Sequence, residues 1–119
     1  MGRLTTHVLD TARGKPGTGI ALTLYRVDRN GTRVEAAAAA VTNADGRCDQ
    51  PLLEGAAMVT GVYDLVFAVG DYLARSGAQI PDPPFVGEVV LRFGVAEPDQ
   101  HYHVPLLVSP WSYSTYRGS

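Results

Sequence analysis

His101–Pro110 has the sequence HYHVPLLVSP, and Ser112–Ser119, SYSTYRGS, follows it after one tryptophan. Alternate residues in the first segment are apolar, which predicts a β-strand that buries one side. The residues on the buried side are Val104, Leu106 and Val108. The residues on the opposite side are His101, His103, Pro105 and Leu107. The first segment therefore predicts a core strand whose outer side carries two histidines.

Trp111–Arg117 predicts one further strand, separated from the first by Pro110. By the same alternation Tyr113 is its core candidate. The residues left for its outer side are Ser112, Ser114 and Tyr116. If the two strands pair, their common outer face collects imidazole, hydroxyl and phenol groups together with apolar ones. That mixture is typical of a subunit interface that contains a site.

The rest of the chain alternates short apolar segments with turn signals. The predicted strands are Leu4–Asp10, Ile20–Val27, Thr32–Thr42, Cys48–Leu53 (a strand or a loop), Val59–Val69 and Val86–Val95. Asn30-Gly31 is a strong hairpin signal, and it favours a strand for the alanine-rich segment that follows. Gly70–Gly77 has room for about two helical turns. Seven or eight short strands and one short helix predict an all-β, two-sheet sandwich.

Size and charge exclude several classes of function. The chain has 119 residues, which predicts a single domain over residues 1–119. The formal net charge of −2, without a basic block, predicts no nucleic-acid partner. No apolar segment approaches the ~20 residues that span a bilayer, so we expect no membrane partner. The single cysteine, Cys48, and the absence of a signal-peptide pattern favour a cytoplasmic location.

The three histidines are His7, His101 and His103. Thr5, His7 and Leu9 share one face of the first strand, and His101 and His103 share one face of theirs. The His-x-His spacing allows a polar solvent-facing strand, a zinc site with His7 as third ligand, or general acid–base catalysis. No carboxylate or cysteine lies at an obvious ligand spacing, so we predict no metal and no cofactor.

Five segments of the chain together resemble the 5-hydroxyisourate hydrolases of the transthyretin-related family. These segments are Leu4–Asp10 (LTTHVLD), Gly14-x-Pro16, Asp45-Gly46-Arg47, His101–Pro110 and the terminal Tyr113–Ser119 (YSTYRGS). The resemblance extends from Leu4 to Ser119. The terminal Tyr-Arg-Gly-Ser is its most specific part, because it distinguishes the hydrolases from transthyretin.

The resemblance implies a transthyretin-like sandwich that assembles as a homotetramer, a dimer of dimers. In that fold the first and the last two strands share a sheet, whose outer face lines a channel between dimers. The implied catalytic residues are His7, Arg47, His103 and Ser119. The implied substrate-binding residues are Ser114, Tyr116, Arg117, Gly118 and, at the channel edge, His101.

The implied reaction is the hydrolysis of 5-hydroxyisourate to 2-oxo-4-hydroxy-4-carboxy-5-ureidoimidazoline in urate degradation. Water adds to a ring carbonyl, and a ring C–N bond breaks without a metal. His7 and His103 are the acid and the base, in an order that the sequence leaves open. The alternative is a transthyretin-like carrier that binds a small ligand in the same channel. Two histidines and Arg47 make a poor apolar channel, so the enzyme is the preferred hypothesis.

Overall fold

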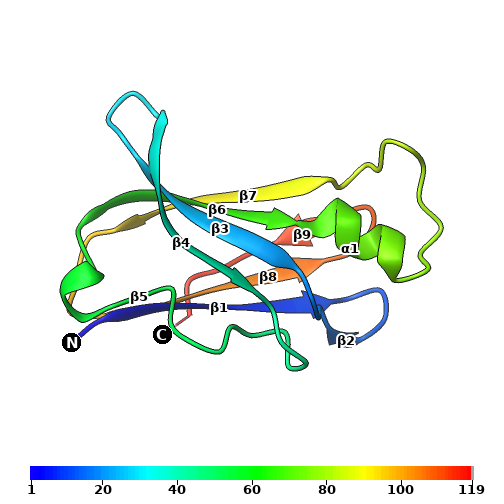
Figure 1. Cartoon of the computed structure of the whole chain (residues 1–119), viewed down its shortest axis with the longest axis horizontal. Coiled ribbons are helices and arrows are strands. Elements are labelled where there is room, and N and C mark those ends of the chain that lie inside the picture. The colour runs from blue at the N-terminus through cyan, green and yellow to red at the C-terminus, as the bar shows by residue number, and fades with distance from the viewer. Residues whose placement is uncertain (119) are drawn as a thin grey trace.

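Two β-sheets stack on each other, with a short α-helix at one end of the sandwich and a 3-10 turn at the other (Figure 1). The computed structural model describes residues 1–118. One sheet has the order β2-β1-β8-β9, with β5 and β2 pairing with opposite ends of β1 on the edge away from β8, and the second has the order β4-β3-β6-β7. The elements are β1 Arg3–Asp10, β2 Lys15–Pro16, β3 Ala21–Val27, β4 Arg33–Val41, β5 Leu53–Glu54, the 3-10 turn Gly55–Ala57, β6 Gly61–Ala68, α1 Val69–Arg75, β7 Glu88–Val95, β8 His101–Val108 and β9 Tyr113–Ser114. The predicted two-sheet sandwich is confirmed.

The core lies between the sheets and follows the predicted alternation. Val104, Leu106 and Val108 of β8 are at most 5% exposed. In β6 the apolar residues Tyr63, Leu65, Val66 and Phe67 are buried, as the sequence predicts, whereas Val62 is 42% exposed. Leu4 and Val8 complete the pattern on β1 with no exposed surface. The odd-numbered residues of β1 and several of β8 are therefore held on the outer face.

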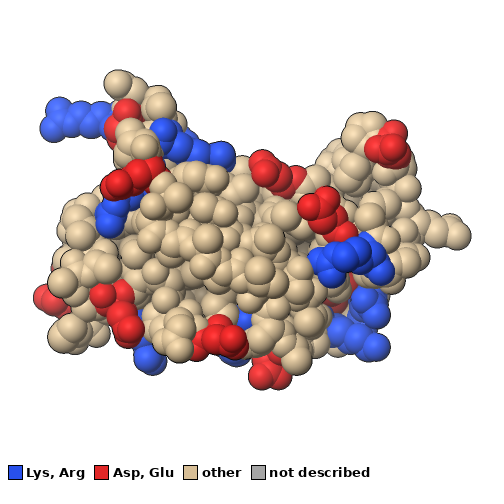
Figure 2. All heavy atoms as spheres, in the orientation of Figure 1, with Lys and Arg blue, Asp and Glu red and all other residues tan. Residues whose placement is uncertain are grey.

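The alanine-rich segment forms a strand, as the preceding hairpin signal predicts. β4 pairs with β3 over the whole length of β3. Gly31 closes the turn between them with φ +80°, a conformation that favours glycine. A run of five alanines is too short for a stable isolated helix, so the pairing decides the conformation. Charged side chains lie around the margin of the face that β4 and β3 occupy, and its middle is uncharged (Figures 1 and 2).

The last predicted strand is the main error of the sequence analysis. Only Tyr113–Ser114 of Trp111–Arg117 is a strand, and it pairs with Leu107–Val108. Tyr113 is 49% exposed, so its predicted place in the core is wrong. The Ser109 side chain accepts hydrogen bonds from the Trp111 and Ser112 backbone N–H groups, which turns the chain at Pro110. Between Ser114 and the end of the described chain, the tail pairs with β8 only through Gly118 and His103.

Other boundaries differ by small amounts. The segment predicted as Cys48–Leu53 pairs with β1 only at Leu53–Glu54. The helix starts one residue before the predicted Gly70 and ends at Arg75, with Val69, Tyr72 and Leu73 buried. Within residues 1–118, no helix has the length and apolar character needed to cross a membrane.

Candidate active site

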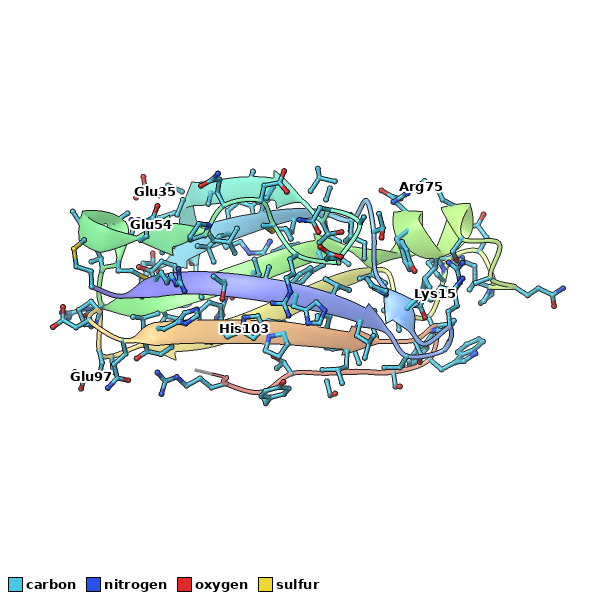
Figure 3. The ribbon with its side chains drawn as sticks, turned by 90° about the horizontal axis from the view of Figure 1, so that it is seen from below. Lys15, Glu35, Glu54, Arg75, Glu97 and His103 are labelled. Atoms are coloured by element: carbon cyan, nitrogen blue, oxygen red, sulfur yellow. The ribbon has the colours of Figure 1, made fainter. Side chains whose placement is uncertain are left out.

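The parallel pairing of β1 with β8 brings the predicted histidines together on one outer face. In this register Thr5 lies beside His103, and His7 lies beside Pro105. Because side chains alternate along a strand, the three histidines project from the same side. Figure 3 shows His103 midway along β8, on the face where β8 and β1 lie side by side.

The His7 and His103 rings stack loosely, with centroids 6.3 Å apart and planes at 27°. The His101 and His103 rings meet edge to face, with centroids 6.5 Å apart. The Thr5 hydroxyl lies between these last two rings. Its oxygen is 2.8 Å from Nδ1 of His103 and 3.0 Å from Nε2 of His101.

A tight turn places Arg47 next to His7. The Asn43 side chain accepts hydrogen bonds from the backbone N–H groups of Asp45 and Arg47. Gly46 has φ +74°, and a Cβ there would lie 2.4 Å from the Val8 carbonyl oxygen, so only glycine fits. The turn then forms a backbone bridge between Arg47 and His7. The Arg47 side chain is exposed at the rim of the histidine cluster.

Both central histidines favour the neutral form. Burial lowers the pKa of His7, and the Arg47 charge lowers it further. Burial also lowers the pKa of His103, with added effects from Arg47, His7 and His101. A neutral imidazole accepts a proton from water near neutral pH. The guanidinium of Arg47 is placed to stabilise a negatively charged oxygen beside these rings.

A hollow of about 490 Å³ opens in front of this cluster. The residues that contribute its ionisable side chains are Arg3, Arg47, Cys48, Asp49, His101 and His103. A larger hollow, about 570 Å³, lies between α1 and the proline-rich loop. Its ionisable groups are the carboxyls of Asp71, Asp82 and Glu88, without a histidine or an arginine. Of these two hollows, the first combines imidazole proton acceptors with a cation, and the second does not.

The tail reaches the cluster through Gly118. The backbones of Gly118 and His103 exchange two hydrogen bonds, of 2.7 and 3.1 Å. A Cβ on Gly118 would lie 3.3 Å from the His103 Cβ, so glycine allows this close approach. Ser119, a predicted catalytic residue, lies outside the described residues.

Three predicted substrate-binding residues do not join the histidine hollow. Arg117 donates to the Gln100 side chain, and its guanidinium lies 4.2 Å from the centre of the Tyr102 ring, so it anchors the tail. Ser114 pairs with Leu107 at the sheet edge. Tyr116 is 60% exposed and lines a separate hollow beside Phe93 and Tyr102.

Thr5 is the site residue that sequence reasoning missed as a functional group. The alternation of β1 placed Thr5 on the same face as His7. Its partners depend on the register between strands that lie almost a hundred residues apart, and no local pattern gives that register. The predicted zinc alternative gains no support, because residues 1–118 contain no group of three His, Cys, Asp or Glu side chains in an arrangement that holds a metal ion.

Fold and site together define a transthyretin-like sandwich with an ionisable outer face. The family model described as HIUase/Transthyretin matches residues 4–118, and the chain belongs to this family. A 5-hydroxyisourate hydrolase of Pseudomonas aeruginosa is 61% identical over 119 residues, which cover 100% of this chain and 93% of the relative.

Two solved structures show that the fold is shared by proteins of different names. The 5-hydroxyisourate hydrolase of Klebsiella pneumoniae has a TM-score of 0.81 and 34% identity, with 100% of both chains covered. Sea bream transthyretin, solved in complex with thyroxine, has a TM-score of 0.83 and 29% identity, with 98% of this chain and 94% of that chain covered. Backbone similarity alone therefore does not distinguish the hydrolase from transthyretin. The side chains of the outer face have to make that distinction.

Proposed function

We propose that this chain hydrolyses 5-hydroxyisourate to 2-oxo-4-hydroxy-4-carboxy-5-ureidoimidazoline, a step of urate degradation. The observation that carries the proposal is the joint placement of His7, His103 and Arg47 on one outer face. Hydrolase relatives with 61% and 60% identity over the full chain support the same activity. A carrier of apolar ligands would gain nothing from two imidazoles with lowered pKa and a guanidinium.

The mechanism begins with a neutral imidazole, which takes a proton from water while the water oxygen bonds to a ring carbonyl carbon. Arg47 stabilises the oxyanion that forms, an effect typically worth about 3–4 kcal/mol. The tetrahedral intermediate then collapses, the C–N bond breaks, and an imidazolium gives a proton to the departing nitrogen. His7 and His103 divide or share these two roles. The Gly118 segment closes the site on the tail side, and the catalytic role of Ser119 stays a prediction.

We propose that the working form is a homotetramer whose dimers face each other across the histidine surface. In the single chain Arg47 and Tyr116 are exposed, whereas a small-molecule site normally buries most of its ligand. β7 pairs with β6 on one side, and within residues 1–118 its other edge has no partner strand. Such an edge favours pairing with a second copy. The lone Cys48 favours a cytoplasmic location.

The test is an absorbance assay with fresh 5-hydroxyisourate made from urate by urate oxidase. We expect the wild-type chain to accelerate decay of the near-ultraviolet band above the spontaneous rate. We expect a chain lacking Tyr116–Ser119 to lose most of this acceleration. A folded wild-type oligomer that leaves the decay at the spontaneous rate contradicts the proposal.

A further inference from the structure

The Thr5 hydroxyl contacts two imidazoles with one oxygen. It lies 2.8 Å from Nδ1 of His103 and 3.0 Å from Nε2 of His101. A hydroxyl carries one hydrogen, so it donates to one of these nitrogens and accepts from the other. When both rings are neutral, this geometry gives them the same tautomer, either both Nδ1–H or both Nε2–H.

The contact also leaves His103 with one ring nitrogen for the substrate. Nδ1 is held by Thr5, and Nε2 is the remaining proton acceptor. In many hydrolases a carboxylate holds the inner nitrogen of the base and stabilises the imidazolium. Here a neutral hydroxyl takes that place, and a second imidazole lies behind it.

We propose that Thr5 is a positioning residue that connects His103 to His101 as a hydroxyl relay. This inference rests on the proposed hydrolase function and assigns the base role to His103. His101 is the proton reservoir at the far end of the relay, and it makes no contact with the reacting atoms.

The relay conserves protons at each step. The water O–H bond breaks, its proton joins Nε2 of His103, and its oxygen bonds to the carbonyl carbon. The Nδ1 proton of His103 passes to the Thr5 oxygen, and the Thr5 hydroxyl proton passes to Nε2 of His101. His103 is then neutral, with its proton on Nε2. As the C–N bond breaks, the reverse transfer through Thr5 returns a proton to Nδ1 and re-forms the His103 imidazolium, whose Nε2 proton goes to the departing nitrogen and leaves His103 neutral with Nδ1–H.

Several ionisable groups surround the rings of the relay. His7 faces His103 from β1, Arg47 faces both from the turn, and Arg3 and Asp49 line the same hollow. Burial and the surrounding positive charges lower the pKa of His103, so a lone imidazolium there is unfavourable. The relay moves this proton off the His103 ring.

The kinetic test uses Thr5→Val, which keeps the shape and removes the hydroxyl, and Thr5→Ser, which keeps the hydroxyl. We expect Thr5→Val to lower kcat about tenfold to a hundredfold, as loss of a supporting partner of a functional group typically does, with KM within about twofold. Thr5→Ser should restore most of kcat. Thr23→Val, a control on β3 in the other sheet, should leave kcat unchanged.

Thr5→Val should also move the acid limb of kcat/KM to lower pH, because the imidazolium of His103 loses its acceptor. His101→Gln should lower kcat as Thr5→Val does, and the double variant should lose no more than either single variant, as expected for groups that act as a unit. Full additivity of the two losses would overturn the relay, and so would an unchanged kcat in Thr5→Val. A rise in KM alone would reassign Thr5 to substrate binding and overturn it as well.

Nitrogen-15 NMR of the histidine rings is a readout that does not depend on turnover. Above the pKa of both rings, the wild-type chain and Thr5→Ser should show His101 and His103 in the same tautomer, and Thr5→Val should remove this match. Opposite tautomers in the wild-type chain would overturn the relay. If the wild-type chain does not accelerate 5-hydroxyisourate decay, the hydrolase proposal fails with its relay, whereas accelerated decay with opposite tautomers removes the relay alone.

Discussion

The outer faces of the two sheets follow the same alternation and carry different chemistry. On the β1–β8 face the ionisable groups are imidazoles, partly exposed, with Arg47 at their edge. On the β3–β6 face the most buried ionisable group is Asp64, 1% exposed and held between Arg33 and Arg92. Hydrogen bonds from Arg92, followed by those from Arg33, lower the pKa of this carboxyl.

The β1–β8 face is therefore suited to chemistry, and the β3–β6 face stabilises the fold. Asp64 accepts hydrogen bonds on both oxygens and is 1% exposed, so its carboxylate is not accessible to a substrate. His7 and His103 have lowered pKa values, and His103 lines an open hollow. A face whose charges are mutually neutralised stabilises the fold, and a face whose groups keep unpaired nitrogens is available for chemistry.

The largest expected effect is on the histidine face. We expect His103→Ala to lower kcat by about 10²–10⁴, the usual contribution of general acid–base catalysis. The free energy of unfolding should change by less than about 1 kcal/mol, because the ring lies on an outer face. Steady-state assays and urea unfolding measure the two quantities, and a stable variant with wild-type kcat would remove His103 from the mechanism.

Arg47→Gln should lower kcat by about 10²–10³, the range for removing an oxyanion donor. It should also raise the pKa of His7 and His103 toward the ordinary value, since the positive charge lowers both. Arg47→Lys is the matched control that keeps the charge. Equal losses in both variants, with unchanged histidine titration in an NMR experiment, would show that the charge is not what matters.

On the opposite face, Asp64→Asn should destabilise the fold by about 3 kcal/mol, because it removes the charge from a buried ion pair with two partners. kcat should stay at the wild-type level wherever the variant is folded. Glu35→Gln removes an exposed ion pair with Arg26 and should cost less than about 1 kcal/mol. Chemical denaturation measures both free energies of unfolding. Similar decreases in the two variants would contradict the distinction between the buried ion pair of Asp64 and the exposed ion pair of Glu35.

The Asp64 network also predicts an acid-induced loss of stability. Its folded-state pKa is below the unfolded value, so its contribution is present above the unfolded pKa of about 3.9 and is lost as pH falls through the folded pKa. As the pH falls, catalytic activity should be lost before the stability that Asp64 contributes. The acid limb of kcat/KM should lie below about pH 6.5, because His7 and His103 both titrate below their ordinary value. An acid limb above pH 7 would contradict the burial of these rings.

The smallest expected effect is at the tail. Gly118→Ala places a methyl group 3.3 Å from the His103 Cβ, which is tight but not forbidden. We expect kcat to fall by less than about tenfold through a small shift of the His103 ring, without a change in oligomer size. Gly94→Ala, where an added Cβ meets nothing within 4 Å, is the matched control.

Local patterns predicted the sandwich because apolar alternation and turn residues act over a few positions. They placed Val104, Leu106 and Val108 in the core, and they put His7 and His103 on outer faces. They failed at Tyr113, because after the turn at Pro110 the chain pairs with the edge of β8 over two residues only, and the Tyr113 side chain there is exposed. Asp64 was missed because its burial depends on arginines from two other strands.

The residues of the site could be predicted from the sequence, but the hydrogen bonds between them could not. The resemblance supplied His7, Arg47 and His103, and the structure brings these three together. The link from Thr5 to His101 and His103 depends on the parallel register of β1 and β8. Two strands separated by most of the chain take that register from the packing of the whole sandwich.

The most direct test compares the two faces in one assay. Decay of 5-hydroxyisourate would be followed for the wild-type chain, His103→Ala and Asp64→Asn, at a temperature where circular dichroism shows all three folded. The account predicts that His103→Ala approaches the spontaneous rate while Asp64→Asn keeps wild-type turnover. Wild-type turnover in His103→Ala, or an equal loss in both variants, would contradict the assignment of hydrolysis to the β1–β8 face.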